Sequence, residues 1–324
     1  MTTLPTLIPL LEPIRPDLEQ VVRLLFETTA EVEEPLGAKL RSALGGGKHV
    51  RPALVILVGR LFDVPIEPFY KLAAAVEVLH TATLIHDDVV DEAPLRRGRA
   101  TLHVTWPVGA TILAGDYLLA QSASLLADLE RPRVLQVFAD TLCTLCRGEI
   151  RQMFAAQQER ISREAYYRRI EAKTASLCAA ATDMAGVLAE AGEAHIAALR
   201  RFGLELGIAF QIVDDVLDFV GDEARLGKPA GGDLRQGLIT LPTLYYLERG
   251  EDDVAVRRLL SGQGDAAHVR AAVEAVRASG AVEDALQEAR AHARQAQAAL
   301  SPLPNNAARQ TLHDLAEYVV ERNR

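Results

Sequence analysis

The stretch HTATLIHDDVVDEAPLRRGRAT, residues 80–101, decides how the rest of the chain is interpreted. It overlaps an apolar run, residues 71–85, that has helical spacing and contains no Pro or Gly, so we predict a buried helix. Asp87 and Asp91 are four positions apart and therefore share one face of that helix. Two desolvated carboxylates repel each other, and a divalent cation would remove that cost. Oxygen ligands without Cys or His favour magnesium, which is usually shared with a substrate phosphate.

Two arginines follow this acidic segment after a short spacer. The guanidinium groups of Arg96 and Arg97 suit a pyrophosphate, because each can form paired hydrogen bonds to its oxygens. A lone DDxxD segment could equally be a solvated acidic helix end. The chain contains a second copy, however: FQIVDDVLD at residues 210–218, after another apolar helical run. Asp214 and Asp218 again share a face, so we expect two helices that set both carboxylate pairs around one cavity.

The composition favours a folded globular protein and argues against several other classes. Hydrophobic residues make up 49% of the 324 residues, enough for a large core, and 24% are charged, so disorder is not indicated. A net charge of -9 argues against a nucleic-acid-binding protein, which would usually be basic. The three cysteines give no disulfide framework, and the CxxC of Cys143 and Cys146 lies in a helical run, where packing is the simpler role. No signal peptide or transmembrane run is found, so we expect a cytoplasmic protein.

Apolar periodicity predicts helices along nearly the whole chain, and no convincing alternating strand is found. We expect one all-α domain, residues 1–324, because no linker divides it. Residues 45–47 and the 221–241 segment are expected to be loops, and the second is long enough to be a functional lid. The expected helices lie at about residues 16–32, 36–44, 53–62, 68–91, 110–129, 134–158, 163–189, 194–220, 241–249, 252–260, 268–278, 282–300 and 307–322.

These motifs resemble those of the trans-type polyprenyl diphosphate synthases, which join isoprenyl units head to tail. Six motifs occur in the family's order between about Gly45 and Leu247, which is far more specific than any one alone. They are GGGKHVRP at 45–52, HTATLIHDDVVDEAPLRRG at 80–98, GEIRQ at 148–152, KTA at 173–175, FQIVDDVLD at 210–218 and GKPAGGDLRQG at 227–237. Two positions depart from the usual pattern: Ala100 replaces a Pro, and Leu238 replaces a Lys that many members carry.

The resemblance implies a helical bundle around a deep central cavity and a homodimer with one active site in each subunit. It implies two substrates, an allylic diphosphate and isopentenyl diphosphate, with a cluster of roughly two to three magnesium ions. The allylic carbon–oxygen bond ionises once the leaving diphosphate is neutralised, the alkene of isopentenyl diphosphate attacks the cation, and a proton is lost. No Ser, Cys or His nucleophile is required.

The resemblance also assigns roles by motif position. Isopentenyl diphosphate is expected to bind the basic side chains Lys48, Arg51, His80 and Arg97. The allylic substrate is expected to contact Arg96, Lys173, Thr174, Gln211 and Lys228, and the Thr174 and Gln211 dipoles could stabilise the carbocation. Metal binding is expected from Asp87, Asp88, Asp91, Asp214 and Asp218, and Asp215 completes the catalytic set.

Product length depends on the floor of the cavity. Four residues that precede Asp87 by one or more turns are expected to line the growing tail: Ala82, Thr83, Leu79 and Val76. Short-chain members of the family typically have aromatic residues at the positions of Ala82 and Thr83, and both are small here. We therefore expect a medium-to-long polyprenyl diphosphate, longer than farnesyl, with geranylgeranyl diphosphate as the alternative.

Two other functions remain open on the sequence. A class I terpene cyclase or head-to-head synthase also uses aspartate-rich helices, but it needs no GGGKxxRP element. A non-catalytic subunit of a heteromeric synthase commonly loses an aspartate motif, and both motifs are intact here.

Overall fold

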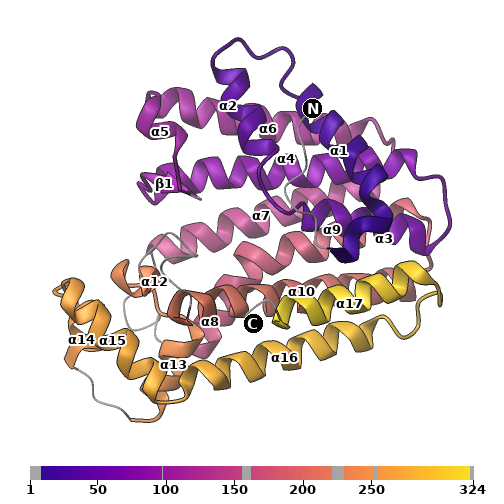
Figure 1. Ribbon diagram of the computed structural model, residues 1–324. Helices are drawn as coiled ribbons and strands as arrows, with labels where there is room; N and C mark the ends of the chain where they lie inside the picture. The colour runs from indigo at the N-terminus through magenta and orange to yellow at the C-terminus, as the bar shows by residue number, and fades with distance from the viewer. Residues whose placement is uncertain (1–8, 97, 155–161, 221–229, 251–253, 322–324) are drawn as a thin grey trace. The chain divides into compact units, whose positions relative to one another are not determined.

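The computed structural model describes residues 9–96, 98–154, 162–220, 230–250 and 254–321. Helices form almost all the regular structure of these residues (Figure 1), which confirms the all-α class. The helical elements are η1 (Pro9–Ile14), α1 (Arg15–Glu27), α2 (Leu36–Leu44), α3 (Val50–Leu61), α4 (Glu67–Val90), α5 (Leu102–Thr105), α6 (Val108–Ala127), α7 (Pro132–Phe154), α8 (Arg163–Ile170), η3 (Glu171–Ala175), α9 (Ser176–Leu188), α10 (Glu193–Val220), α12 (Gly232–Arg235), α13 (Leu241–Glu248), α14 (Val254–Leu260), α15 (Ala266–Ala278), α16 (Ala281–Ala299) and α17 (Ala307–Glu321).

One short hairpin lies between the helices expected at residues 68–91 and 110–129. Strands β1 (Leu95–Arg96) and β2 (Arg99–Ala100) pair antiparallel, with Leu95 opposite Ala100. Gly98, at a φ of 74°, supplies the left-handed backbone conformation that a tight turn needs. A period-2 pattern cannot be recognised in two-residue strands, so these strands were not predictable from apolar periodicity.

The chain divides into two compact units by its internal contacts. The first comprises Met1–Thr141, Leu177–Arg200 and Leu300–Asp314, and the second comprises Leu142–Ser176, Arg201–Ala299 and Leu315–Arg324. Both units are helical. That the whole chain forms a single domain around a central cavity stays a prediction.

Helix α4 is the centre of the first unit. It packs most extensively against α6 and also against α3 and α1 (Figure 1). Every residue from Leu72 to Leu79 is buried, so the helix is covered on all sides over two turns. Such a helix presents a fixed base for the residues at its carboxyl end, where the first acidic motif lies.

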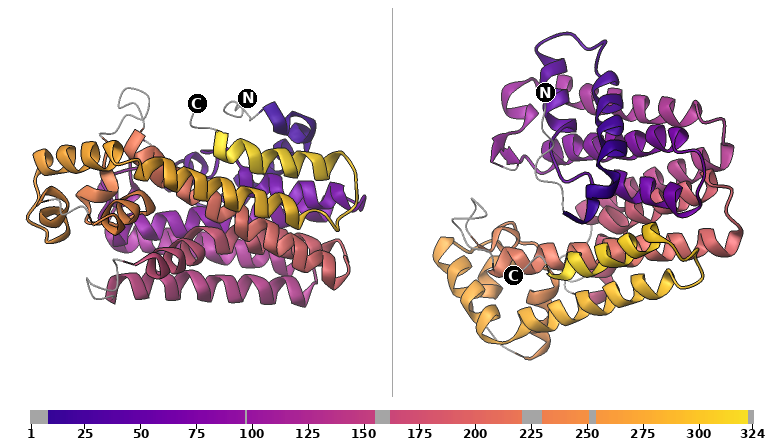
Figure 2. Two further views of the ribbon diagram at one scale, coloured as in Figure 1. Left: turned by 90° about the horizontal axis from the view of Figure 1, so that it is seen from below. Right: turned by 45° about the vertical axis from the view of Figure 1, so that its right-hand side comes forward.

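The second unit has its own apolar core where α10 ends. Phe219 of α10 packs with side chains from α12 to α16, among them Tyr246, Val256 and Val273. Helices α14 and α15 lie side by side, as Figure 1 and the turned views of Figure 2 show. This core fixes the end of α10, which carries the second acidic motif.

Candidate active site

The first acidic motif lies at the end of α4. The backbone N–H of Asp91 donates to the carbonyl of Asp87 at 2.8 Å, so helical geometry continues through the motif. The two side chains therefore lie one turn apart on one face, as predicted from their spacing. Asp87 is half-buried and Asp91 is exposed, which leaves both able to meet a ligand from solvent.

Asp88 has a partner that the sequence did not indicate. Its side chain is buried, and the Nε atom of Arg96 donates to its Oδ1 atom at 2.6 Å. Burial raises the pKa of Asp88, and the Arg96 guanidinium opposes that shift. The metal role predicted for Asp88 and the substrate role predicted for Arg96 both stay predictions.

The basic residues before α3 lie next to a strained turn. His49 precedes the helix with a φ of 46°, a left-handed conformation that non-glycine residues rarely adopt. Its side chain is buried, whereas Lys48 beside it is exposed and Arg51 is half-buried. His49 thus anchors the segment that carries two predicted diphosphate ligands.

The anchor for His49 is Glu77 of α4. The Nδ1 atom of His49 lies 3.5 Å from the Oε1 atom of Glu77, an ion-pair distance rather than a close hydrogen bond. Burial alone would raise the pKa of Glu77. Pairing with His49 and the charges of His80 and Arg51 outweigh burial and lower the pKa of Glu77 to about 2. Glu77 is therefore the counter-charge for three basic side chains of this region.

The second acidic motif lies in the last turns of α10. Asp214 is exposed, and Asp218 is half-buried. The Asp218 carboxylate accepts hydrogen bonds from the backbone N–H groups of Gly232 and Asp233, each at 3.1 Å, at the start of α12. Gly231 is required before them, because its φ is 77° and a Cβ atom there would lie 2.6 Å from a side chain of α15. Asp218 thereby ties the predicted lid segment to the acidic motif.

Asp233 adds a further carboxylate beside this motif. Burial raises the pKa of Asp233 to about 7, and the charge of Asp218 adds to the effect. Asp215 and Asp214 act in the same direction, while Arg169 opposes it. Several carboxylates therefore lie close together at this motif. A divalent cation such as magnesium fits that donor set and would relieve the repulsion.

The KTA motif lies in η3, a single turn of π-helix. Thr174 Oγ1 donates to Gln211 Oε1 of α10 at 2.7 Å, so the two predicted allylic contacts touch each other. Lys173 Nζ lies 2.9 Å from Glu149 Oε1 of the GEIRQ motif. A Cβ atom on Gly148 would lie 2.6 Å from the Ala172 Cβ atom, so glycine allows this close approach of α7 to η3. π-Helical turns of this kind occur frequently at functional sites.

The first unit contains the first acidic motif and also Lys48, Arg51 and His80. The second unit brings together the second acidic motif with the KTA and GEIRQ residues. Ala82, Leu79 and Val76 are buried in the first unit, and Thr83 is half-buried. Arg97 and Lys228 lie outside the described residues. That both units surround one cavity stays a prediction.

A sequence model of the polyprenyl synthetase family matches residues 33–276 of the chain. The chain belongs to this family. It is 38% identical to heptaprenyl diphosphate synthase component 2 of Geobacillus stearothermophilus, over 94% of this chain and 99% of that one. It is 37% identical to the octaprenyl diphosphate synthase of Escherichia coli, over 86% of this chain and 87% of the other.

A solved structure of the family matches equally well. The polyprenyl synthase of Caulobacter crescentus, crystallised with calcium and isoprenyl diphosphate, has a TM-score of 0.89 and 35% identity over 97% of each chain. The chain described here is accordingly a prenyltransferase of the polyprenyl diphosphate synthase type. The terpene cyclase and the non-catalytic subunit are not favoured.

Four residues of this synthase were missed by sequence reasoning: His49, Glu77, Asp233 and Tyr166, whose hydroxyl donates to Asp215 of the second acidic motif. Glu77 had a visible signal, since it interrupts an apolar helical run, and a buried charge needs a partner. Asp233 lies inside a motif that was recognised but not examined residue by residue. Tyr166 gave no signal, because a tyrosine at a buried helix position is ordinary.

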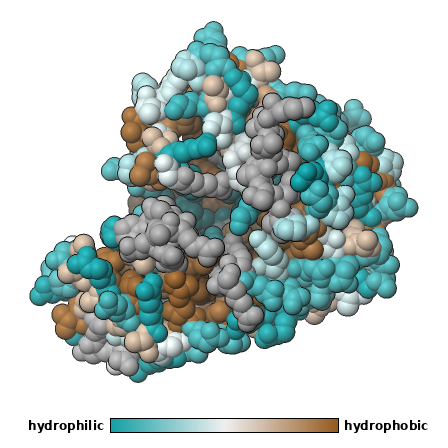
Figure 3. Space-filling model, viewed as in Figure 1, coloured by the Kyte–Doolittle hydropathy of each residue, from teal (hydrophilic) through white to brown (hydrophobic). Residues whose placement is uncertain are grey.

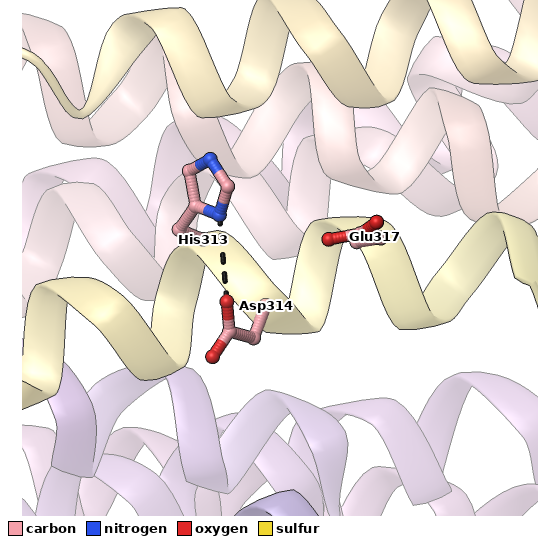
Figure 4. A group of neighbouring side chains, drawn as sticks. All are labelled: His313, Asp314 and Glu317. Atoms are coloured by element: carbon pink, nitrogen blue, oxygen red, sulfur yellow. Dashed lines mark ion pairs between the residues drawn. The ribbon is translucent and has the colours of Figure 1, made fainter.

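A further group of possible metal ligands lies on α17, outside the synthase motifs. His313, Asp314 and Glu317 have ligand atoms within 4.8 Å of one another (Figure 4). His313 Nδ1 lies 3.5 Å from Asp314 Oδ1, and Glu317 is exposed. Nothing besides this proximity points to a ligand, so we assign the group no role.

Among the described helices, none is long and apolar enough to cross a membrane.

Proposed function

We propose that this synthase extends an allylic diphosphate by successive additions of isopentenyl diphosphate, giving a linear trans-polyprenyl diphosphate longer than farnesyl. The observation that carries the proposal is that α4 and α10 each end in an acidic motif with an arginine near it: Arg96 at Asp88, and Arg169 at Asp215. Diphosphate chemistry needs this combination, because carboxylates hold cations and basic groups hold phosphate oxygens directly.

The residues of the first unit are proposed to hold isopentenyl diphosphate. Lys48 and Arg51 lie at the start of α3 and His80 lies on α4, and Arg97 is proposed to join them. Glu77 pairs with His49, and its negative charge offsets part of the positive charge of Arg51 and His80. The alkene must be presented in one orientation, so a rigid diphosphate clamp lowers the entropy cost of the reaction.

The residues proposed to bind the allylic substrate come mainly from the second unit. Lys173, Thr174 and Gln211 lie on η3 and α10, and Arg96 of β1 and Lys228 are proposed to complete the set. Thr174 and Gln211 present oxygen dipoles that can stabilise the positive charge formed at the allylic carbon.

The metal ligands are proposed to be carboxylates from both motifs: Asp87, Asp88, Asp91, Asp214 and Asp218. Magnesium bound there would neutralise the negative charge that develops on the departing diphosphate. The related Caulobacter crescentus structure holds calcium, another oxygen-preferring divalent ion. Asp233 increases the local negative charge and so favours cation binding at the second motif.

Chain length is proposed to be set on α4. Ala82 and Thr83 leave room one turn before Asp87, where a ring would fill the space. The two curated relatives described above are named as heptaprenyl and octaprenyl synthases, which supports a medium-to-long product. Geranylgeranyl diphosphate, the shorter alternative, is not favoured by these relatives.

The active form is proposed to be a homodimer. A cytoplasmic location stays our expectation. Apolar side chains are exposed on α6 of the first unit, with Leu113 68% and Val108 52% exposed. Figure 3 shows further hydrophobic side chains near β1 and α5, where Leu95 and Val104 are more than half exposed. Exposed apolar groups of this kind are typical of surfaces that bind another chain.

Release of diphosphate tests the proposed reaction directly. Purified protein is incubated with magnesium and with isopentenyl diphosphate, farnesyl diphosphate or both, and liberated diphosphate is measured. We expect release only when both substrates are present, because ionisation is productive only when an alkene captures the cation. Release from farnesyl diphosphate alone would instead indicate a cyclase or a hydrolase.

A further inference from the structure

A chain of hydrogen bonds in the second unit joins four side chains. Tyr166 of α8 donates from its hydroxyl to Asp215 Oδ2 at 2.7 Å, and Gln211 Nε2 donates to Asp215 Oδ1 at 2.9 Å. Thr174 Oγ1 then donates to Gln211 Oε1 at 2.7 Å. Tyr166, Asp215 and Thr174 are buried, and Gln211 is half-buried, so water competes little with these bonds.

The order of donors and acceptors in this chain is fixed by Asp215. Both Asp215 oxygens accept hydrogen bonds, one from the Tyr166 hydroxyl and one from Gln211 Nε2, so the Gln211 amide turns its NH₂ group toward Asp215. Its carbonyl oxygen then faces Thr174, and the single hydroxyl proton of Thr174 is used on that oxygen. Lone pairs, rather than protons, are left on the remaining sides of Thr174 Oγ1 and Gln211 Oε1.

Tyr166 limits the movement of the Asp215 carboxylate. Its ring is fixed by an edge contact with Tyr167, with centroids 5.5 Å apart, and by the Arg169 guanidinium 5.4 Å from the ring centroid. Burial and then the charge of Asp215 raise the pKa of Tyr166 well above its ordinary value, so the hydroxyl keeps its proton and acts as a donor. Asp215 therefore has a partner on each oxygen and little freedom to rotate.

We propose that Tyr166 and Asp215 are positioning residues that set the polarity of Gln211 and Thr174, so that oxygen lone pairs meet the cation formed at the allylic carbon. This rests on the proposed function, which assigns Gln211 and Thr174 to the allylic substrate. During ionisation the bonding electron pair leaves with the diphosphate, and the two oxygens stabilise the positive carbon that remains. If the amide were reversed, N–H groups would face that carbon and destabilise it.

The test uses substitutions that alter this polarity while changing side-chain volume little. In Asp215→Asn the new amide can donate to Gln211 Oε1, which allows the Gln211 amide to reverse. Tyr166→Phe removes only the donor to Asp215. Tyr167→Phe is the matched control, because the Tyr167 hydroxyl bonds to Glu288 and lies 3.3 Å from His292 Nε2, outside the chain of four.

We expect Asp215→Asn to lower kcat at least about tenfold, with KM for both substrates nearly unchanged. Tyr166→Phe should lower kcat less, and Tyr167→Phe should leave kcat near the wild-type value. Thermal unfolding of all three variants identifies any loss of folded protein.

A second readout separates cation stabilisation from a general structural role. Each variant is assayed with an allylic diphosphate and with its analogue carrying fluorine at C2, which withdraws electrons and destabilises the cation. We expect the rate ratio between the two substrates to widen in Asp215→Asn and Tyr166→Phe but not in Tyr167→Phe. An unchanged ratio in Asp215→Asn would overturn the inference. Wild-type protein that forms no product from either substrate would instead overturn the proposed function.

Discussion

Glu77 is a buried carboxylate that lies among basic side chains in a helix of otherwise apolar residues. Its folded-state pKa of about 2 lies below the ordinary value of 4.5, so the folded chain binds this proton less tightly than the unfolded chain does. The stability that Glu77 contributes is therefore fully present above about pH 4.5 and is lost as the pH falls toward 2.

We predict that Glu77→Gln lowers the free energy of unfolding near pH 7 by on the order of 3 kcal/mol. The difference from wild type should shrink as the pH falls below 4.5, because wild-type Glu77 then becomes protonated. Urea unfolding of both proteins at a series of pH values measures this difference in the free energy of unfolding. Glu67→Gln, an exposed change on the same helix, is the control. A difference that does not depend on pH would contradict the assignment of the low pKa to Glu77.

The same substitution should also affect substrate binding. His49 would lose its counter-charge and with it the support for its left-handed conformation, so Lys48 and Arg51 would be less well placed. We expect a higher KM for isopentenyl diphosphate and little change for the allylic substrate. Steady-state kinetics with both substrates varied separate the two effects.

At the acidic motifs, we predict that Asp87→Ala or Asp214→Ala lowers kcat by roughly 10²–10³-fold or more while the protein stays folded. Each change removes a proposed metal ligand from a position that is not buried, so stability is little affected. EDTA should abolish turnover of the wild type, and added magnesium should restore it. Asp128→Ala is a suitable control, because Asp128 is exposed and pairs only with Lys71 among the contacts found for it. Near-normal turnover of Asp87→Ala would refute the metal role.

At the scale of single elements, α4 combines a buried stem with a functional end. Its apolar residues and its acidic motif were both predictable from spacing, since helix periodicity and the i,i+4 rule are local properties. The partners of those residues were not predictable in this way. The Asp88–Arg96 pair depends on a hairpin whose strands have only two residues each. The Glu77–His49 pair joins α4 to the start of α3. Both contacts depend on tertiary packing, which a sequence pattern does not encode.

In the second unit, the helical character of the segment around η3 was also predictable from the sequence, but its detailed geometry and contacts were not. The segment from Arg163 to Ala189 was predicted as one helical region, and the structure contains helix throughout Arg163–Leu188. The π-helical turn within it was not predicted, because composition does not distinguish π- from α-helical turns. That turn carries Thr174, whose bond to Gln211 was likewise beyond a sequence pattern.

We predict that Ala82→Phe on α4 shortens the product. Ala82 is buried, so a ring must fill adjacent space, and the proposed tail path is the space one turn before Asp87. Chromatography of the dephosphorylated products measures chain length. Ala73→Phe is the control, since Ala73 is equally buried but lies nine residues, about half a turn of rotation, from Ala82. A product distribution that is unchanged in Ala82→Phe, or shortened equally by Ala73→Phe, would contradict this placement.

At the scale of the whole molecule, the exposed apolar side chains of α6 support a homodimer. We predict that light scattering gives a dimer mass at micromolar concentration, and that Leu113→Glu lowers the dimer fraction, because a charge would replace a 68% exposed apolar side chain. Asp128→Ala again serves as a control at the other end of α6. A wild-type protein that is monomeric at this concentration would contradict the prediction.

One relative is named as component 2 of a heptaprenyl diphosphate synthase, which raises the question of whether this chain needs a second protein for activity. All catalytic motifs expected for the reaction are present in the sequence of this chain, so no second protein is needed to supply them. We therefore predict that the chain acts alone.

The most direct measurement is the product formed by the purified chain alone from farnesyl diphosphate, labelled isopentenyl diphosphate and magnesium. The products are dephosphorylated, separated by chromatography and identified by mass spectrometry. We predict linear all-trans polyprenyl alcohols longer than farnesol as the main products. Cyclised hydrocarbons, or no elongation by a folded protein that still binds both diphosphates, would contradict it.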